Sequence, residues 1–458
     1  MTQPAPSAST PTRGEQLVDF ISAGHGRVYP PEVLDAARKA FVDYLGVTLG
    51  AMNDPPVRAV SAAIRRWNAP GKATVFHSYT TAPALAALVN GTATHSQDYD
   101  DTHPLGAGHP SGPVWSATLA MAQELGLSGG AMIGAYITGY EVMAKLGNGG
   151  PNGVGRALQR NGFHPTSVVG RAGAASSTAV LLGLTPHQTG SALGNAATTM
   201  GGLVGSFGTH SKPFHAGKAA MDGIMAAQYA AEGYEAAQTL YEIKGGWLSA
   251  MIQDASGDIP TLDDFGTRWE ILGNGFKLFA SCRATHASTE TARSLADKVK
   301  GRAIRSVHVR THGHALVTAG KGKPVTPLEG KFSIPFCVAM GLSGRHLLPS
   351  DFVEATLQEA PIMALIDRIT VQPVVGQSPA EAHVEVVMED GEVLKATTKI
   401  LKGHPDNPLS WDELRHKFEA MVAPLHSAAD VDALYEAARS IDTPEALAEV
   451  MRIAGPRA

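Results

Sequence analysis

Apolar residues recur at every third or fourth position over much of the chain, and the first such segment begins at Pro31. Leu34, Phe41 and Leu45 share one face of it, which is the spacing of an amphipathic helix. Pro31 suits the first helical turn, because its missing N–H has no intrahelical partner there. Further helices are predicted over residues 82–93, 114–125, 131–146, 167–182 and 217–232.

Many of these predicted helices are rich in Ala, Gly, Ser and Thr. A glycine inside a helix costs about 1 kcal/mol relative to alanine. The chain contains 50 glycines, so we expect some of them to serve close packing and loops. The pattern therefore predicts a compact bundle in which helix backbones approach one another closely.

The pattern changes near residue 275. Val307, Val309 and Thr311 alternate with polar neighbours, as in a half-buried strand. The segment HVEVVMEDGEVLKATTKI (383–400) has two β-rich arms joined at Asp390-Gly391, which is a strong hairpin signal. These strands predict a smaller α+β unit in this part of the chain.

Helical periodicity returns after Trp411, where Leu414 and Phe418 share a face. We therefore predict a mainly α protein in which both ends of the chain build one helical domain. The N-terminal segment is rich in Pro, Ser and Thr, which predicts a disordered tail. The predicted parts are a tail at 1–13, an all-α domain at 14–276 and 401–458, and an inserted α+β domain at 277–400.

Composition narrows the class of protein. Among 458 residues, 44% are hydrophobic, 17% are charged and the net charge is −5, which is typical of a globular chain. No basic stripe favours nucleic acid, and no apolar leader or membrane span is predicted. Two cysteines, Cys282 and Cys337, fit a reducing compartment. We expect a cytoplasmic protein that binds neither nucleic acid nor membrane.

Four stretches combine titratable side chains with glycine or proline. They are DYDDTHPLGAGHPSG (98–112), GFHPTS (162–167), GTHSKPFHAGKAAMDG (208–223) and LGNGFKLFASCRATH (272–286). Each has a structural interpretation when taken alone: the aspartates would cap helices, and a lone histidine is commonly structural. Lys277 stands among apolar neighbours, so it either reaches to the surface or is partly buried with a lowered pKa.

Several familiar motifs are absent. No glycine-rich nucleotide loop follows a predicted strand. His95, Asp98, His103 and His109 are metal-ligand types, but their spacing matches no zinc-protease signature and a proline follows both His103 and His109. A metal site built from these residues is conceivable by ligand type, but their spacing does not favour it.

Taken in order, five motifs resemble the MmgE/PrpD family, which includes 2-methylcitrate dehydratase, cis-aconitate decarboxylase and iminodisuccinate epimerase. They lie between residues 90 and 414 and read NGTATHSQDYDDTHPLGAGHPSG, GFHPTS, GTHSKPFHAGKAAMDG, EGKFSIPF and GHPDNPLSWDEL. The resemblance implies a large all-α domain, a smaller α+β lid domain and an active site between them. It also implies a homodimer, a small di- or tricarboxylate substrate, and no cofactor.

The resemblance carries over to six positions, of which three are expected to be catalytic and three to bind substrate. They are the catalytic His109, Lys212 and Asp98 and the substrate-binding Thr102, His164 and Lys277. We hypothesise that His109 and Lys212 transfer protons and that Asp98 orients His109. Lys277 and His164 would hold substrate carboxylates, and Thr102 would add a hydrogen bond.

The leading hypothesis is a cofactor-independent lyase, a dehydratase or decarboxylase, that acts on a cis-aconitate- or methylcitrate-like acid by proton transfer next to a carboxylate. An epimerase of a dicarboxylate and a non-catalytic carboxylate-binding protein are the alternatives. The decarboxylases carry a lid tyrosine near the segment that here reads HALVTAGKGKPVTP (314–327) and holds none. His314 or Lys321 would substitute, or the substrate would differ. Typical 2-methylcitrate dehydratases have HPSDN where this chain has HPSGP at His109. This difference counts mildly against methylcitrate as the substrate.

Overall fold

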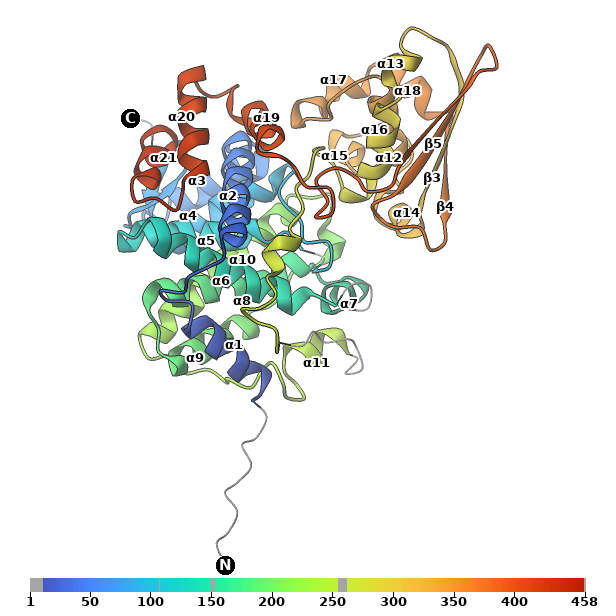
Figure 1. The fold of residues 1–458 in the computed structure, drawn as a ribbon. Helices are drawn as coiled ribbons and strands as arrows, with labels where there is room; N and C mark the ends of the chain where they lie inside the picture. Colours follow the sequence, from blue (N-terminus) through green and yellow to red (C-terminus); the bar gives the residue numbers. More distant parts are fainter. Residues whose placement is uncertain (1–10, 107, 150–152, 254–261, 457–458) are drawn as a thin grey trace, which may run out of the picture.

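The structure is a computed structural model, and it describes residues 11–106, 108–149, 153–253 and 262–456. Figure 1 shows a large helical body, with a small sheet standing beyond it at one side of the molecule. Most of the predicted tail, residues 1–10, lies outside the described residues. Thr12 caps the first helix, which begins at Arg13, so the helix starts at the last residue of the range predicted for the tail.

The helical body is formed by the first eleven helices and the last three. Among the described residues its elements are α1 Arg13–Ser22, α2 Pro31–Ala51, α3 Pro55–Arg65, β1 Ala73–Val75, β2 Tyr79–Thr81, α4 Pro83–Ser96, α5 Ser111–Leu125, α6 Gly129–Gly147, α7 Val154–Arg160, α8 Pro165–Leu182, α9 Pro186–Thr198, α10 Ser211–Ala231, α11 Trp247–Ile252, α19 Trp411–Val422, α20 Ala428–Arg439 and α21 Ala446–Ala454. Each helix predicted from periodicity is confirmed, with ends that differ by a few residues. Within the described ranges, no helix combines the length and apolarity that crossing a bilayer requires.

The remaining elements form the α+β part. They are α12 Arg283–Arg293, α13 Ala296–Val299, β3 Ile304–His312, α14 Gly313–Ala319, α15 Pro327–Gly330, α16 Ile334–Leu342, α17 Glu354–Leu357, α18 Ala360–Ile366, β4 Ile369–Val374, β5 Ala382–Met388 and β6 Val393–Thr398. The sheet has the order β4-β3-β5-β6, and α12 packs on β5 and β6. The mainly α fold with a smaller α+β part is confirmed.

The predicted strand is β3, and the predicted hairpin is the β5–β6 pair. β5 pairs antiparallel with both β3 and β6. The sequence pattern did not predict β4, which pairs parallel to β3. Pro373 lies within β4, and a proline usually argues against a strand because it cannot donate to the ladder. It is tolerated here because β4 is an edge strand.

Close backbone approach holds the centre of the helical body together. Gly91 of α4 faces Gly217 of α10, and a Cβ added to Gly217 would lie 2.1 Å from the carbonyl oxygen of Leu88. The two helices can therefore cross only because both positions lack side chains. This contact confirms the prediction that small residues serve close helix packing.

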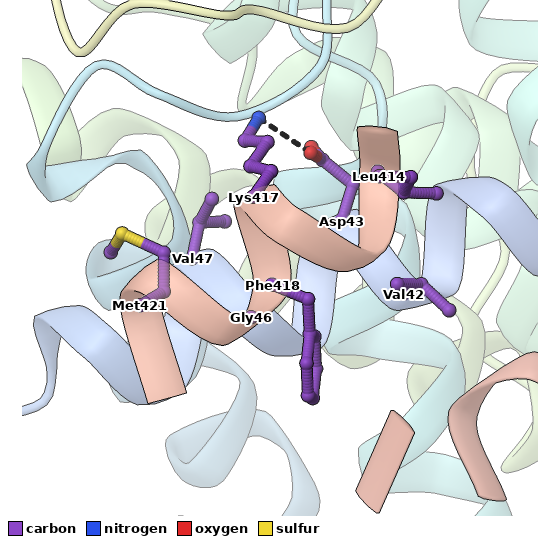
Figure 2. A pocket seen from close by; sticks show the side chains of 8 residues that line it. All are labelled: Val42, Asp43, Gly46, Val47, Leu414, Lys417, Phe418 and Met421. Atoms are coloured by element: carbon purple, nitrogen blue, oxygen red, sulfur yellow. Dashed lines mark ion pairs between the residues drawn. The ribbon is translucent and has the colours of Figure 1, made fainter. Parts of the chain in front are cut away.

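The C-terminal helix α19 returns to pack on α2. Figure 2 shows the pocket that these two helices line, with the Lys417 ammonium reaching across to Asp43. Lys417 Nζ lies 2.6 Å from Asp43 Oδ1, and both side chains are buried. Burial raises the pKa of Asp43 and lowers that of Lys417, and the attraction between the two opposes both shifts. Contacts between the two ends of the chain agree with a discontinuous helical domain, while its boundaries at 276 and 401 remain predictions.

Candidate active site

The polar stretches meet where three helices begin. His109 lies just before α5, His164 caps α8, and Lys212 lies in the first turn of α10. The His109 backbone N–H donates to Thr166 Oγ1 at 3.1 Å, and this hydrogen bond links the segment before α5 to the first turn of α8. The helix dipole makes a helix start favourable for negative charge. The three helix starts therefore surround a region fitted to anions.

Asp98 lies between two lysines from distant parts of the chain. Lys212 Nζ and Lys277 Nζ each lie 2.8 Å from the same oxygen, Asp98 Oδ1. All three side chains are buried, and Lys277 is only 1% exposed. Burial alone would raise the pKa of Asp98, but the two ammonium groups hold that pKa well below its usual range. Asp98 is therefore an ionised carboxylate that carries two buried cations.

The backbone brings Lys277 to this position. The Thr102 N–H donates to the Gly275 carbonyl at 2.7 Å, and the Gly275 N–H donates back to the Thr102 carbonyl at 2.8 Å. Lys277 Nζ also donates to the Asp98 carbonyl oxygen at 2.8 Å. Lys277 is therefore buried and does not reach to the surface. The Thr102 hydroxyl lies 3.5 Å from the Gly275 carbonyl, so this predicted substrate ligand also serves the loop.

Asp100, rather than Asp98, is the acid beside His109. Asp100 Oδ1 lies 3.2 Å from His109 Nδ1, and Asp100 Oδ2 lies 2.9 Å from His95 Nδ1. The contact with His109 that was expected of Asp98 is therefore made by Asp100, while two lysines lie on Asp98. Burial would raise the pKa of Asp100, but the two imidazoles hold it well below its usual range.

His95 is fully buried, and burial lowers its pKa to about 4 against the opposing attraction of Asp100. Its Nε2 has no hydrogen-bond partner among the residues that the structure describes. The His95 ring lies 4.5 Å from the His109 ring and 5.6 Å from the His164 ring, centroid to centroid. A neutral imidazole with one free nitrogen therefore stands between the two predicted histidines.

His164 contacts a fourth histidine. Its Nδ1 lies 3.1 Å from His215 Nδ1, so one of the two rings donates to the other. Burial lowers the pKa of His164 well below its usual range, and burial likewise lowers that of His215 to about 4. His164 is consequently neutral at neutral pH. It would meet a substrate carboxylate as a neutral hydrogen-bond donor.

Asp101 has a structural environment. Its carboxylate accepts hydrogen bonds from the Ser111 N–H at 3.1 Å, the Ser111 hydroxyl at 2.6 Å and the Asn274 side chain at 2.9 Å. These contacts fasten the start of α5 to the segment before Lys277. Of the three aspartates in the DYDD stretch, Asp98 and Asp100 thus face the cations and imidazoles, and Asp101 holds the loop.

Lys331, from the EGKFSIPF motif, has a place at the site that the sequence did not reveal. Its Nζ donates to the Gln97 carbonyl at 2.6 Å. Burial lowers its pKa to about 8, opposed by Asp98 and Asp54. Because Lys331 stands directly before the largely apolar run FSIPF, a lysine beside apolar residues was the available signal. Both substitutes considered for a lid tyrosine are exposed: His314, and Lys321, whose side chain is 62% exposed and lies 3.9 Å from Glu329.

Four side chains offer potential metal ligands that all lie within 4.8 Å of one another. They are His95, Asp98, Asp100 and His109. Two ammonium groups already lie against Asp98, and their charge would repel a divalent cation. The donor set therefore fits a metal poorly, and the sequence-based expectation of no metal stays a prediction.

Together, the fold and the site define a mainly α protein with a smaller α+β part and a buried centre of paired carboxylates, ammonium groups and imidazoles. The MmgE/PrpD N-terminal domain matches residues 15–259 and the MmgE/PrpD C-terminal domain matches residues 279–443. The chain belongs to the MmgE/PrpD family.

Three relatives are cis-aconitate decarboxylases. The protein of Homo sapiens is 27% identical over 389 residues, which cover 79% of this chain and 77% of that protein. That of Mus musculus is 23% identical over 439 residues, covering 92% and 89%. That of Aspergillus terreus is 24% identical over 443 residues, covering 90% of each. The similarity therefore extends over most of both chains.

Proposed function

We propose that this chain is a lyase of the MmgE/PrpD type that acts on a small di- or tricarboxylate by proton transfer next to a carboxylate. One observation carries the proposal: Lys212 and Lys277 share Asp98 Oδ1 beside the pair of imidazoles on Asp100. The relatives named cis-aconitate decarboxylase favour an acid of that type as substrate. Dehydration and decarboxylation are the two reactions under this proposal.

Substrate binding would use the positive charge already assembled. A polycarboxylate needs several cations in a place that water does not reach. Lys212 and Lys277 are buried ammonium groups, and the starts of α5, α8 and α10 add helix dipoles. A substrate carboxylate would take hydrogen bonds from the lysines and from neutral His164, in place of part of the Asp98 contact.

The chemical step creates negative charge on a carbon next to a carboxylate. In decarboxylation, the bond to the leaving carboxylate breaks, carbon dioxide departs, and the electron pair left on carbon takes a proton. In dehydration, a base removes the proton from that carbon and the hydroxyl leaves as water with a second proton. Fixed ammonium groups stabilise the developing charge in either case.

His109 would serve as the proton donor or acceptor at carbon. Its side chain is 15% exposed, more than that of Asp98 or of the two lysines beside Asp98. Asp100 lies at ion-pair distance and would stabilise the imidazolium form as the proton arrives. Lys212 would supply the second proton. Acid–base catalysis of this kind contributes roughly 10²- to 10⁴-fold.

Proton NMR of candidate acids in deuterated buffer tests the proposal. Purified protein would be incubated with cis-aconitate, methylcitrate and related di- and tricarboxylates. We expect one acid either to lose carbon dioxide, with deuterium at the carbon that received the proton, or to lose water together with the proton on the carbon next to the carboxylate. Exchange of an α-proton with the carbon skeleton retained would instead indicate an epimerase, and binding without any exchange would indicate a carboxylate-binding protein.

A further inference from the structure

Three consecutive backbone carbonyls at the site each accept a hydrogen bond from a different buried lysine. Lys331 Nζ donates to Gln97 O at 2.6 Å, Lys277 Nζ to Asp98 O at 2.8 Å, and Lys417 Nζ to Tyr99 O at 2.7 Å. The three lysines are at least 91% buried. Only Lys277 was among the residues expected at the site.

The two further lysines come from elements far along the chain. Lys331 follows α15 directly, and Lys417 lies in α19. Lys331 faces Asp98, Asp54 and the two lysines on Asp98. Lys417 pairs with Asp43 and stands over the Tyr99 ring, 4.0 Å from its centroid. The segment that presents Asp98 is therefore held from both the α+β part and the C-terminal helices.

This segment needs outside support because it follows the end of α4. The last carbonyls of a helix lack intrahelical partners, and cationic side chains satisfy them well. Asp98 moreover has φ of +53°, a left-handed conformation that a residue with a Cβ adopts at a cost. That conformation persists only where the surroundings fix it.

We infer that Lys331 and Lys417 are positioning residues, which hold the Gln97–Tyr99 turn so that the Asp98 carboxylate stays between the Lys212 and Lys277 ammonium groups. The inference rests on the proposed function for its effect on catalysis. The placement of the turn itself does not depend on any substrate. Both residues act through the backbone.

Hydrogen exchange without substrate tests the placement of the turn. The Thr102 and His103 amides donate to Gly275 O and Gly108 O, so their protection reports the order of the loop. We expect Lys331→Met to speed exchange in a peptide spanning 96–104 by about tenfold or more, with the rest of the helical body unchanged. Lys323→Met, at an exposed lysine of the same part of the chain, is the matched control and should behave as wild type.

Lys417 requires a paired change, because removing it alone would leave Asp43 as an uncompensated buried charge. The double variant Asp43→Asn/Lys417→Met should also loosen the 96–104 peptide. If Lys331→Met does not fold, Lys331→Gln, which keeps a neutral donor on a shorter side chain, takes its place. Wild-type exchange in both folded variants overturns the inference.

Turnover supplies the second measurement, on an acid that wild type converts. We expect kcat of Lys331→Met to fall by about 10- to 100-fold, the scale of a misplaced catalytic group, and Lys331→Arg to restore part of it. A merely structural role would lower the melting temperature and leave kcat per folded molecule unchanged, which would contradict the inference. If wild type converts no acid, the proposed function fails and the exchange measurement alone decides the placement.

Discussion

At the scale of single residues, the site is a set of buried charges that are stable only together. Asp98 compensates two lysines, and Asp100 lies at ion-pair distance from the His95 and His109 imidazoles. Removing one member of a buried pair leaves the other charge without a partner, which is far worse than losing an exposed pair. Each of these side chains therefore has both a chemical and a structural role.

Turnover tests the proton-transfer roles. We expect His109→Ala and Lys212→Ala each to lower kcat by roughly 10²-fold or more, because a general acid or base contributes that much. Steady-state assays on the acid identified by NMR measure this. His210→Ala is a suitable control, since His210 precedes α10 and is exposed. Near wild-type turnover in both variants would refute the assignment.

The dependence of stability on acidic pH tests whether Asp98 is held ionised by its lysines. Because the two lysines hold the folded pKa of Asp98 below its ordinary 3.8, its carboxylate stabilises the fold above about pH 4. That contribution is lost as the pH falls below this value. Asp98→Asn should therefore destabilise the fold by about 3 kcal/mol near neutral pH, and the gap to wild type should narrow in acid.

Urea unfolding at several pH values measures the Asp98 effect. Asp297→Asn, at an exposed aspartate, is the control and should change stability little at any pH. A gap between wild type and Asp98→Asn that is constant down to pH 3 would show that Asp98 is not held ionised by its lysines.

At the scale of elements, periodicity was sufficient to predict the long helices but not the site they form. A segment such as α4 is apolar enough to bury on every side, so the pattern indicates a helix without indicating its neighbour. Two glycines determine which helix packs against α4. Gly91 and Gly217 allow α4 and α10 to cross in backbone contact, which places the end of α4 beside the start of α10.

The crossing of α4 and α10 can be tested with one methyl group. Gly217→Ala would place a Cβ 2.1 Å from Leu88 O, so the helices must separate. We expect a loss of about 1–3 kcal/mol or more in unfolding free energy, and lower turnover because Lys212 lies on the same helix. Thermal unfolding measures the change in stability. Gly130→Ala, where a Cβ meets nothing within 4 Å, is the control and should be neutral or slightly stabilising.

At the scale of the whole molecule, distant segments of the chain contact one loop. The Gln97–Tyr99 turn contacts lysines from three later segments, residues 277, 331 and 417. Those contacts join the helical body to the α+β part and to the C-terminal helices. Because the site residues are almost completely buried, a substrate of the proposed kind would enter only if the parts around the loop separate, as in enzymes that close over their substrates.

Assembly is the remaining prediction at this scale. The family resemblance implies a homodimer, so we expect light scattering on the purified protein to give twice the chain mass of 47.8 kDa. The mass should be unchanged over a tenfold dilution if the dimer is stable. A mass of one chain at all concentrations would contradict the prediction.

The sequence by itself determined the mainly α fold, the long helices, the β5–β6 hairpin and the stretches that supply the site. Helix and strand periods are local properties, and Asp98, His109 and Lys212 lie in loops or helix starts that glycine and proline mark. Only the tertiary structure decided which groups pair. Lys331 and Lys417 reach the same turn through contacts between residues 234 and 318 positions apart. The lysines that lie on Asp98, while Asp100 faces His109, come from 114 and 179 positions away. No spacing within one segment encodes such contacts, because they are set by how helices cross.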